Sequence, residues 1–158
     1  MPSLAPPMAR TLAFRFFAMC CPILTFIFHR GYIPYVSWEV EFTGEFERWW
    51  AELSEEEQEE ISAKVELLEE HGPTLPRPHA DVITTSKHSN MKELRGKVRE
   101  ANLRVLYAFD PRRTALLLIG GDKTGNPKWY QQFVPIADDL FDKHLAQLRK
   151  AAKHGKKL

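Results

Sequence analysis

Seven basic residues lie among apolar runs in one stretch of the chain, and their side chains are suited to binding phosphate. They are Lys92, Arg95, Lys97, Arg99, Arg104, Lys123 and Lys128. The stretch ends at an aromatic pair, Trp129-Tyr130. Guanidinium and ammonium groups carry the charge opposite to that of a phosphate and donate several hydrogen bonds to its oxygens. A small sheet that carries such cations at strand ends is therefore expected to bind phosphates.

The charge of the chain is segregated along the sequence, although its net value is only +1. Residues 36–86 contain fourteen acidic and three basic side chains, whereas residues 87–158 contain sixteen basic and seven acidic ones. Such a division can attract a polyanion or an oppositely charged partner even when the global charge is close to zero. The alternative is a soluble domain with ordinary surface ion pairs. That alternative explains the acidic helical region better than it explains the cations within the strands.

The length and the cysteine and histidine content exclude several classes of protein. A chain of 158 residues has room for one domain with a real hydrophobic core. Cys20 and Cys21 are adjacent in an apolar run, so they give neither a disulfide framework nor metal-ligand spacing, which fits a reducing cytoplasm. The sequence has no HExxH motif, Cys/His cluster, glycine-rich phosphate loop or GxSxG elbow. We therefore expect no metal and no cofactor.

The most hydrophobic segment spans residues 12–28. Arg15 and Pro22 interrupt it, which argues against a clean transmembrane helix, and no small-x-small cleavage site precedes Val36. Because Val36 directly precedes the first regular strand pattern and bacteria can initiate at GTG codons, we hypothesise that translation starts at or near Val36. The expected organisation is a hydrophobic extension at 1–35, a domain at 36–153 and a basic tail at 154–158, with no stable membrane association.

Two helices are predicted after a first strand at residues 37–42, where polar and apolar residues alternate. Thr43 is a plausible N-cap for the first helix. Ser54 and Glu57 have the form of a capping box that opens the second helix, which ends near Gly72. The residues expected to form the apolar faces of these helices are Phe46, Trp49, Trp50, Leu53, Ile61, Val65 and Leu68.

The second half of the chain predicts three strands and a final helix. A loop is expected at residues 75–89, and the strands are expected at residues 90–94, 103–109 and 114–119. A segment that begins at Gly120 is expected to break the last strand, and a helix is expected at roughly 136–153. The resulting order, β-α-α-β-β-β-α, predicts an α+β domain with a mostly antiparallel sheet and helices packed on one face.

Three sequence blocks within this order have a more specific pattern. They are residues 88–95 (HSNMKELR), 103–111 (LRVLYAFDP) and 116–123 (LLLIGGDK), followed by Trp129-Tyr130. Together they resemble the phage Gp49-like, HigB-type branch of the RelE/ParE toxin superfamily. The resemblance covers roughly residues 38–148, and it implies the same RelE-like strand and helix order.

The resemblance implies the toxin of a cytoplasmic type II toxin–antitoxin pair. Its implied partner is a cognate antitoxin, expected to be a helix-turn-helix DNA-binding protein encoded nearby. RelE and HigB members cleave mRNA on the ribosome, so a metal-independent endoribonuclease that inhibits translation and growth is the implied activity. The alternative is a ParE-like toxin, which inhibits DNA gyrase and is not a nuclease. ParE-like members generally lack the assembled cationic set.

The resemblance also implies roles for individual residues. Arg104 matches the family's strand arginine that faces the scissile phosphate, and Lys123 matches the cation after the paired glycines. Tyr130 matches more loosely the late aromatic that stacks on a base. The implied catalytic residues are Arg104, Arg95, Lys123, Lys92, Tyr130 and His88, and the residues implied to bind the RNA backbone are Lys97, Arg99 and Lys128.

Each of these assignments has a structural alternative. Arg95 and Arg104 have three acidic residues near them in the sequence, Glu93, Glu100 and Asp110, with which an ordinary surface ion network would form. The Tyr130 ring would equally well cap the core beside Trp129, and a loop histidine before a strand is more often merely exposed.

Overall fold

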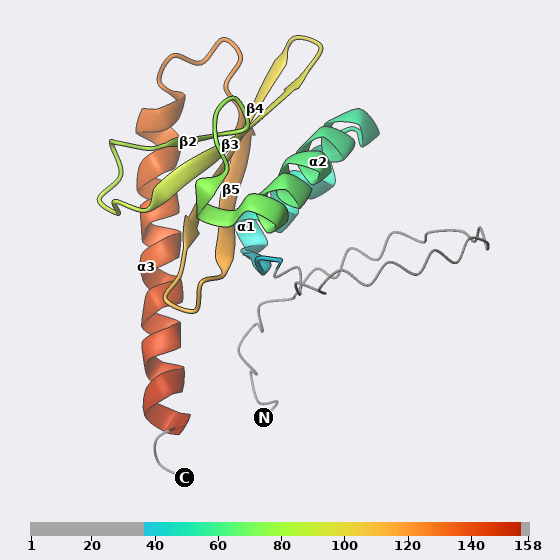
Figure 1. Cartoon of the computed structure of the whole chain (residues 1–158). Coiled ribbons are helices and arrows are strands. Elements are labelled where there is room, and N and C mark those ends of the chain that lie inside the picture. The colour runs from blue at the N-terminus through green and yellow to red at the C-terminus, as the bar shows by residue number, and fades with distance from the viewer. Residues whose placement is uncertain (1–36, 156–158) are drawn as a thin grey trace, which may run out of the picture.

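The computed structural model describes residues 37–155 (Figure 1). The order of elements is β1 (Val40–Phe42), α1 (Gly44–Glu52), α2 (Glu55–His71), the 3-10 helix η1 (Gly72–Thr74), β2 (Ala80–Val82), β3 (Met91–Val98), β4 (Ala101–Phe109), β5 (Ala115–Asp122) and α3 (Trp129–Gly155). The hypothesised start at Val36, the extension at 1–35 and the last three residues of the basic tail lie outside the described residues.

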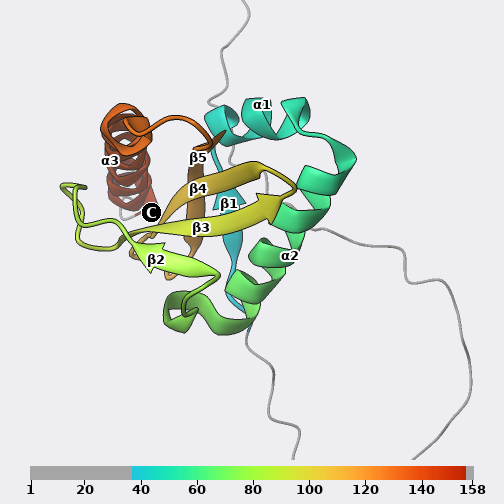
Figure 2. The same cartoon turned by 90° about the horizontal axis from the view of Figure 1, so that it is seen from above.

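The five strands form one sheet in the order β1-β5-β4-β3-β2 (Figure 2). The pairs β2–β3, β3–β4 and β4–β5 are antiparallel, whereas β1 runs parallel to β5. The prediction of an α+β domain with a mostly antiparallel sheet is therefore confirmed. The parallel edge follows from the chain path, because α1 and α2 intervene between β1 and the hairpins that build the rest of the sheet.

The helices cover both faces of the sheet, which differs in this detail from the expected arrangement on one face. Figure 1 shows the sheet between α3 on one side and α1 and α2 on the other. Alternate residues of β4 explain the difference: Val105 and Tyr107 are buried against α1 and α2, whereas Leu106 and Ala108 are buried against α3. A strand that is apolar on both faces needs a layer on each.

The starts and ends of α1 and α2 agree with the sequence signals. The Thr43 Oγ1 accepts a hydrogen bond from the Phe46 N–H at 3.2 Å. The Ser54 Oγ accepts from the Glu57 N–H, and the Glu57 carboxylate accepts from the Ser54 N–H at 2.9 Å, so the predicted capping box is confirmed. The α2 helix ends before Gly72, whose φ of 55° is the left-handed conformation that glycine adopts readily.

The paired glycines of the 116–123 block lie inside β5 and do not break it as expected. A Cβ atom at Gly120 would approach the Trp49 ring to 2.2 Å, and one at Gly121 would approach the Trp129 indole nitrogen to 2.8 Å. The two tryptophans lie on opposite faces of the sheet, so each glycine makes room for one of them. Glycine inside a strand here marks close packing of a neighbour and not a turn.

Three other features differ from expectation. The predicted loop at 75–89 contains the short edge strand β2, and β3 continues to Val98. The α3 helix begins at Trp129, seven residues before the expected start, and carries Pro135 inside it. Burial of Trp129, which is 0% exposed, favours these two extra turns, although Pro135 cannot donate a backbone hydrogen bond within them. None of the helices within residues 37–155 has an apolar stretch long enough to cross a membrane.

Candidate functional site

The pairing of β3, β4 and β5 brings together cations that are separated in the sequence. Arg95 of β3 lies opposite Arg104 of β4, and Arg104 lies opposite Gly121 of β5. Lys123 follows β5 directly, and its N–H donates to the Asn102 carbonyl at 2.9 Å. Alternation along the strands directs Arg95 and Arg104 to the face that α3 covers. Like charges in opposite positions repel, so this arrangement requires a negative charge nearby.

Glu93 supplies that charge from the buried side of the cluster. Its side chain is 1% exposed, and its Oε1 accepts a hydrogen bond from the Arg95 Nε at 2.8 Å. The Arg104 Nε lies 3.7 Å from the Glu93 Oε2. The hydrogen bond to Glu93 is the largest cause of the raised pKa of Arg95. A buried carboxylate therefore holds two guanidinium groups side by side at the surface of the sheet.

Tyr130 joins the same carboxylate from the first turn of α3. Its hydroxyl donates to the Glu93 Oε2 at 2.9 Å and lies 3.4 Å from the Lys123 Nζ. The Lys123 ammonium lies 4.5 Å from the centre of the Tyr130 ring, within the range of a cation–π contact. Trp129 is fully buried and stacks on Phe133 at 4.5 Å, which fixes this end of the helix. The half-buried Tyr130 therefore packs partly against the core while its hydroxyl joins the cations. We call Arg95, Arg104, Lys123, Tyr130 and Glu93 the cation cluster.

The edge strand β2 provides a second carboxylate behind Arg95. The Asp81 Oδ2 accepts hydrogen bonds from the Arg95 Nη2 at 2.8 Å and makes an ion pair with the Arg77 Nη2 at 2.5 Å. The pKa of Asp81 lies below its usual range, chiefly because of the Arg77 hydrogen bond, with smaller contributions from the Val82 N–H and Arg95. Arg95 is therefore fixed between two carboxylates.

The Arg104 guanidinium makes fewer hydrogen bonds to carboxylates than the Arg95 guanidinium does. Its Nη1 donates one hydrogen bond, to the Leu103 carbonyl at 2.8 Å. Its Nε is buried and has no hydrogen-bond partner, although it lies near Glu93. The side chain remains 15% exposed. The group therefore keeps charge and donors that an incoming anion can use.

Lys92 does not join the cation cluster, although the sequence groups it with Arg95. It is opposite Tyr107 in the β3–β4 register, and Tyr107 belongs to the core on the α1 and α2 face. The Lys92 Nζ donates to the Pro73 carbonyl at 2.6 Å. Arg95 follows Lys92 by three positions, an odd offset, so a strand directs the two side chains to opposite faces.

His88 is also placed away from the cation cluster. Its Nε2 lies 2.9 Å from an Asp142 carboxylate oxygen, and its ring contacts the edge of Phe141. Asp142 follows Tyr130 by twelve residues in α3, which corresponds to about 18 Å along the helix axis. Within residues 37–155, no group of three or more His, Cys, Asp or Glu side chains is arranged to hold a metal ion.

The three residues implied to bind the RNA backbone are all exposed, but they do not share one position relative to the cation cluster. Lys97 is exposed and follows Arg95 by two positions on the same face of β3. Arg99, at the turn between β3 and β4, is exposed and pairs with Glu56 at 2.6 Å. Lys128 is exposed just before α3. Lys97 and Lys128 thus flank the cluster, whereas Arg99 is already paired with the acidic helix.

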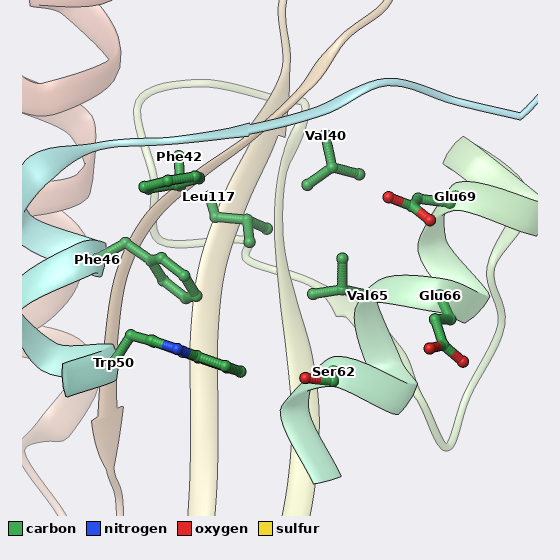
Figure 3. Close-up of a pocket in the computed structure, with 9 residues that line it drawn as sticks. All are labelled: Val40, Phe42, Phe46, Trp50, Ser62, Val65, Glu66, Glu69 and Leu117. Carbon is green, nitrogen blue, oxygen red and sulfur yellow. The ribbon is translucent and has the colours of Figure 1, made fainter. Parts of the chain in front are cut away.

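An apolar pocket of about 40 Å³ lies on the other face of the sheet, among β1, α1 and α2 (Figure 3). Phe42, Phe46 and Val65 contribute to its wall, and Glu66 and Glu69 lie at the α2 side. Burial, and then the charge of Glu66, raise the pKa of Glu69. This pocket contains none of the residues of the cation cluster.

The residues that the sequence-based assignment missed, one in the cation cluster and one that contacts it, are acidic. Glu93 was considered only as part of a surface ion network, yet it is the buried centre of the site. The Glu93-x-Arg95 spacing, which places both side chains on one face of a strand, is the signal that identifies it. Asp81 lies in a strand that was expected to be a loop. The assembled groups can neutralise a phosphate through three cations and move a proton through the Tyr130 hydroxyl.

Sequence comparisons match a large part of the described chain to known proteins. Residues 48–142 match the family model described as "Phage derived protein Gp49-like". A Mycobacterium tuberculosis (strain ATCC 25618 / H37Rv) protein named as a candidate toxin, HigB3, is 46% identical over 101 residues, which cover 63% of this chain and 87% of that protein. A second protein of the same strain, named as a candidate toxin, HigB2, is 42% identical over 113 residues, which cover 68% of this chain and 56% of that protein.

Proposed function

Since the chain belongs to the phage-derived Gp49-like family and is a HigB-type toxin of a toxin–antitoxin system, we propose that it is an endoribonuclease that cleaves mRNA on the ribosome. Cleavage there would stop translation and growth. The family implies a cognate antitoxin that neutralises the toxin. The acidic and basic halves of the sequence offer such a partner two surfaces of opposite charge.

The observation that carries the proposal is the assembly of Arg95, Arg104 and Lys123 around one tyrosine hydroxyl and one buried carboxylate. RNA can be cleaved without a cofactor when its own 2′-hydroxyl attacks the adjacent phosphate. This reaction needs a proton acceptor, cations that stabilise charge on the phosphoryl oxygens and a proton donor for the departing 5′-oxygen. The cation cluster contains candidates for all three roles.

In the proposed reaction, Arg104 binds the phosphoryl oxygens through its terminal Nη groups, whose hydrogen bond goes to the Leu103 carbonyl and to no carboxylate. The Tyr130 hydroxyl donates its proton toward Glu93, so its oxygen lone pairs remain to accept the proton of the 2′-hydroxyl. The proton of Tyr130 then passes to Glu93. Lys123, 3.4 Å from the Tyr130 oxygen, is the nearest donor for the departing 5′-oxygen. The products are a 2′,3′-cyclic phosphate and a 5′-hydroxyl end.

The proposal is tested by inducing the full chain and its Arg104→Ala variant and mapping the 5′ ends of cellular transcripts. We expect the wild type to produce new, codon-phased ends. In Arg104→Ala, cleavage should fall by about 10²- to 10³-fold, the usual loss when one donor to a developing charge is removed. Lys92→Ala is the matched control, because that cation lies on the opposite face of the sheet and should leave cleavage unchanged.

DNA topology measured in the same cells distinguishes the alternative function. Gyrase-linked DNA breaks without new RNA ends would select a ParE-like toxin and reject the nuclease. Full cleavage by Arg104→Ala, with a circular dichroism spectrum matching the wild type, would reject the assigned phosphate site.

A further inference from the structure

Lys123 is the one member of the cation cluster that lies in a loop, directly after the end of β5. Loops are generally more mobile than the strands and helices that they connect. Transfer of a proton to a departing oxygen, in contrast, requires the donor to lie within hydrogen-bond reach. The position of the Lys123 ammonium therefore depends on the contacts that hold its backbone.

The backbone of Lys123 is hydrogen-bonded in both directions. Its N–H donates to the Asn102 carbonyl at 2.9 Å, and its carbonyl accepts from the Asn126 N–H at 3.0 Å. Asn102 belongs to β4 and precedes Arg104 by two positions. The hydrogen bond to Asn102 therefore ties the start of the loop to the strand that carries the phosphate-binding arginine.

The Asp122 carboxylate joins the same two segments. Its Oδ1 accepts hydrogen bonds from the Thr124 N–H at 2.8 Å and from the Asn102 N–H at 3.0 Å. Burial opposes ionisation of this carboxyl, but hydrogen bonds from Thr124 and Asn102 and the charge of Arg104 outweigh it and lower the pKa of Asp122. The acceptor is therefore charged at neutral pH, and a charged acceptor makes the stronger hydrogen bonds.

The Thr124 hydroxyl completes the contacts at this end of the sheet. Its Oγ1 accepts a hydrogen bond from the Asn102 N–H at 2.9 Å and donates one to the Glu100 carbonyl at 3.0 Å. We call Asn102, Asp122 and Thr124 the strand-end network. Because this network bonds the residues on both sides of Lys123, its loss would release the loop at the residue that carries the ammonium.

The side chain of Lys123 is not held firmly by its own contacts. Lysine has a flexible four-carbon stem. The Lys123 Nζ lies 3.4 Å from the Tyr130 hydroxyl and 4.5 Å from the centre of the Tyr130 ring. The first distance is long for a hydrogen bond. A shift of the Lys123 backbone would therefore also move the ammonium.

We propose that Asp122 is a positioning residue that holds Lys123 where its ammonium can protonate the departing 5′-oxygen. In this step the bond from the 2′-oxygen to phosphorus forms and the bond from phosphorus to the 5′-oxygen breaks. One proton passes from the Lys123 ammonium to the 5′-oxygen. The inference rests on the proposed function, because it takes RNA cleavage as the reaction. It goes further by assigning a role to a carboxylate outside the cation cluster.

An RNA with sulfur in place of the departing 5′-oxygen tests this role. A thiolate is a much weaker base than an alkoxide, so the sulfur departs without a proton. The sulfur is placed at a cut site found by transcript mapping, and cleavage of this RNA and of the matching normal RNA on ribosomes is measured with the full chain.

Asp122→Ala removes the acceptor for both N–H groups. On the normal RNA we expect kcat to fall about 10²-fold, as for a catalytic group displaced by about 1 Å, while KM stays within about twofold of wild type. On the sulfur-containing RNA we expect kcat to stay within about threefold of wild type, because the proton donor is not needed. Asp122→Asn keeps an oxygen that can accept both hydrogen bonds and should restore kcat on the normal RNA to within about fivefold of wild type.

Two controls separate positioning from other effects. In Asp110 a single Oδ1 likewise accepts from two N–H groups, those of Arg112 and Thr114, but at the opposite end of the β4–β5 pair. Asp110→Asn should therefore lower stability and affect both RNAs equally. Arg104→Ala should slow cleavage of both RNAs, because Arg104 is assigned to the phosphoryl oxygens and not to the departing atom.

Equal slowing of both RNAs by Asp122→Ala would overturn the proposal, because a general loss of structure does not distinguish between departing atoms. A normal kcat in a folded Asp122→Ala would overturn it as well. If this variant does not fold, Thr124→Val, which removes the hydroxyl and keeps the shape, should slow the normal RNA selectively, and equal rates on both RNAs would overturn the proposal. A wild type that cleaves neither RNA rejects both the nuclease and this role, whereas a cleaving wild type with an unselective Asp122→Ala rejects this role alone.

Discussion

Replacement of Glu93 by glutamine tests whether a buried carboxylate organises the cation cluster. Glutamine keeps the shape of the side chain and removes its negative charge. Glu93→Gln would weaken the 2.8 Å hydrogen bond to Arg95 and the 3.7 Å ion pair with Arg104. The Tyr130 hydroxyl, 2.9 Å from the carboxylate, would keep a neutral acceptor. The change therefore isolates charge from packing.

The expected cost to stability follows from these contacts. Breaking a fully buried ion pair costs about 3–5 kcal/mol. The partners of Glu93 are partly exposed, at 32% for Arg95 and 15% for Arg104, and Arg95 keeps Asp81 as a second partner. We therefore expect a loss of about 2 kcal/mol in the free energy of unfolding, since a hydrogen bond to a charged group contributes ~1.5–3 kcal/mol. For a domain of this size, that loss lowers the thermal midpoint by about 8 °C.

The expected cost to RNA cleavage is larger, because both guanidinium groups lose the anchor that sets their positions. A displacement of about 1 Å in a catalytic group can reduce the rate by ~10²-fold. Circular dichroism melting and cleavage of a defined RNA measure the two effects on the same protein. Glu100→Gln is the matched control, because Glu100 is exposed at the β3–β4 turn. A melting temperature within about 1 °C of wild type, or full cleavage by Glu93→Gln, would refute the role of the buried carboxylate.

Two further substitutions test the fold around the site. Asp110→Asn should destabilise the protein at pH 7 by about 2 kcal/mol, since it removes the charge that pairs with Arg112 and bonds His144. Burial opposes ionisation of Asp110, but hydrogen bonds from His144, Arg112 and Thr114 outweigh it and lower its pKa. A lowered carboxyl pKa stabilises the fold above the unfolded pKa of about 3.9, and this contribution disappears as the pH falls through the folded pKa. The difference between wild type and variant, measured by urea unfolding, should therefore shrink at pH 3. Gly120→Ala should cost about 1–3 kcal/mol, because the new Cβ would overlap the Trp49 ring in the core.

Each of these substitutions has an outcome that would contradict its explanation. A stability difference for Asp110→Asn that is the same at pH 3 and pH 7 would show that the carboxylate charge does not contribute. For Gly120→Ala, an unchanged urea midpoint would mean that α1 moves aside without cost. Gly125→Ala offers a comparison, because Gly125 has φ of 68° and no neighbour within 4 Å of an added Cβ. Any loss at that position reports backbone strain and not crowding.

The helices at the start of the domain were predictable because their signals are local. The Thr43 cap and the Ser54–Glu57 capping box involve residues three positions apart, and both hydrogen-bond patterns are confirmed. The apolar spacing of α2 likewise identified Ile61 and Leu68, each 0% exposed. Short-range geometry of this kind is fixed by chain connectivity, so the order of amino acids is sufficient to show it.

The elements that were misjudged depend on neighbours distant in the sequence. The paired glycines were expected to end a strand, but Trp49 and Trp129 explain their place inside β5. Helix α3 was expected to start after Pro135. It begins about two turns earlier, because this start allows Trp129 to be buried. In both cases a packing partner on another element outweighed the local propensity of glycine or proline.

The sequence by itself determined the α+β class, the family and the presence of many cations between Lys92 and Lys128. Only the tertiary structure decided which of them form a site. The strand register places Arg95 opposite Arg104, and the alternation of side chains along β3 places Lys92 on the other face. The first turn of α3 brings the Tyr130 hydroxyl to the Glu93 carboxylate. The physical reason is that composition and periodicity follow from neighbours along the chain, whereas a charged site depends on which distant side chains share a face and a few ångströms of space.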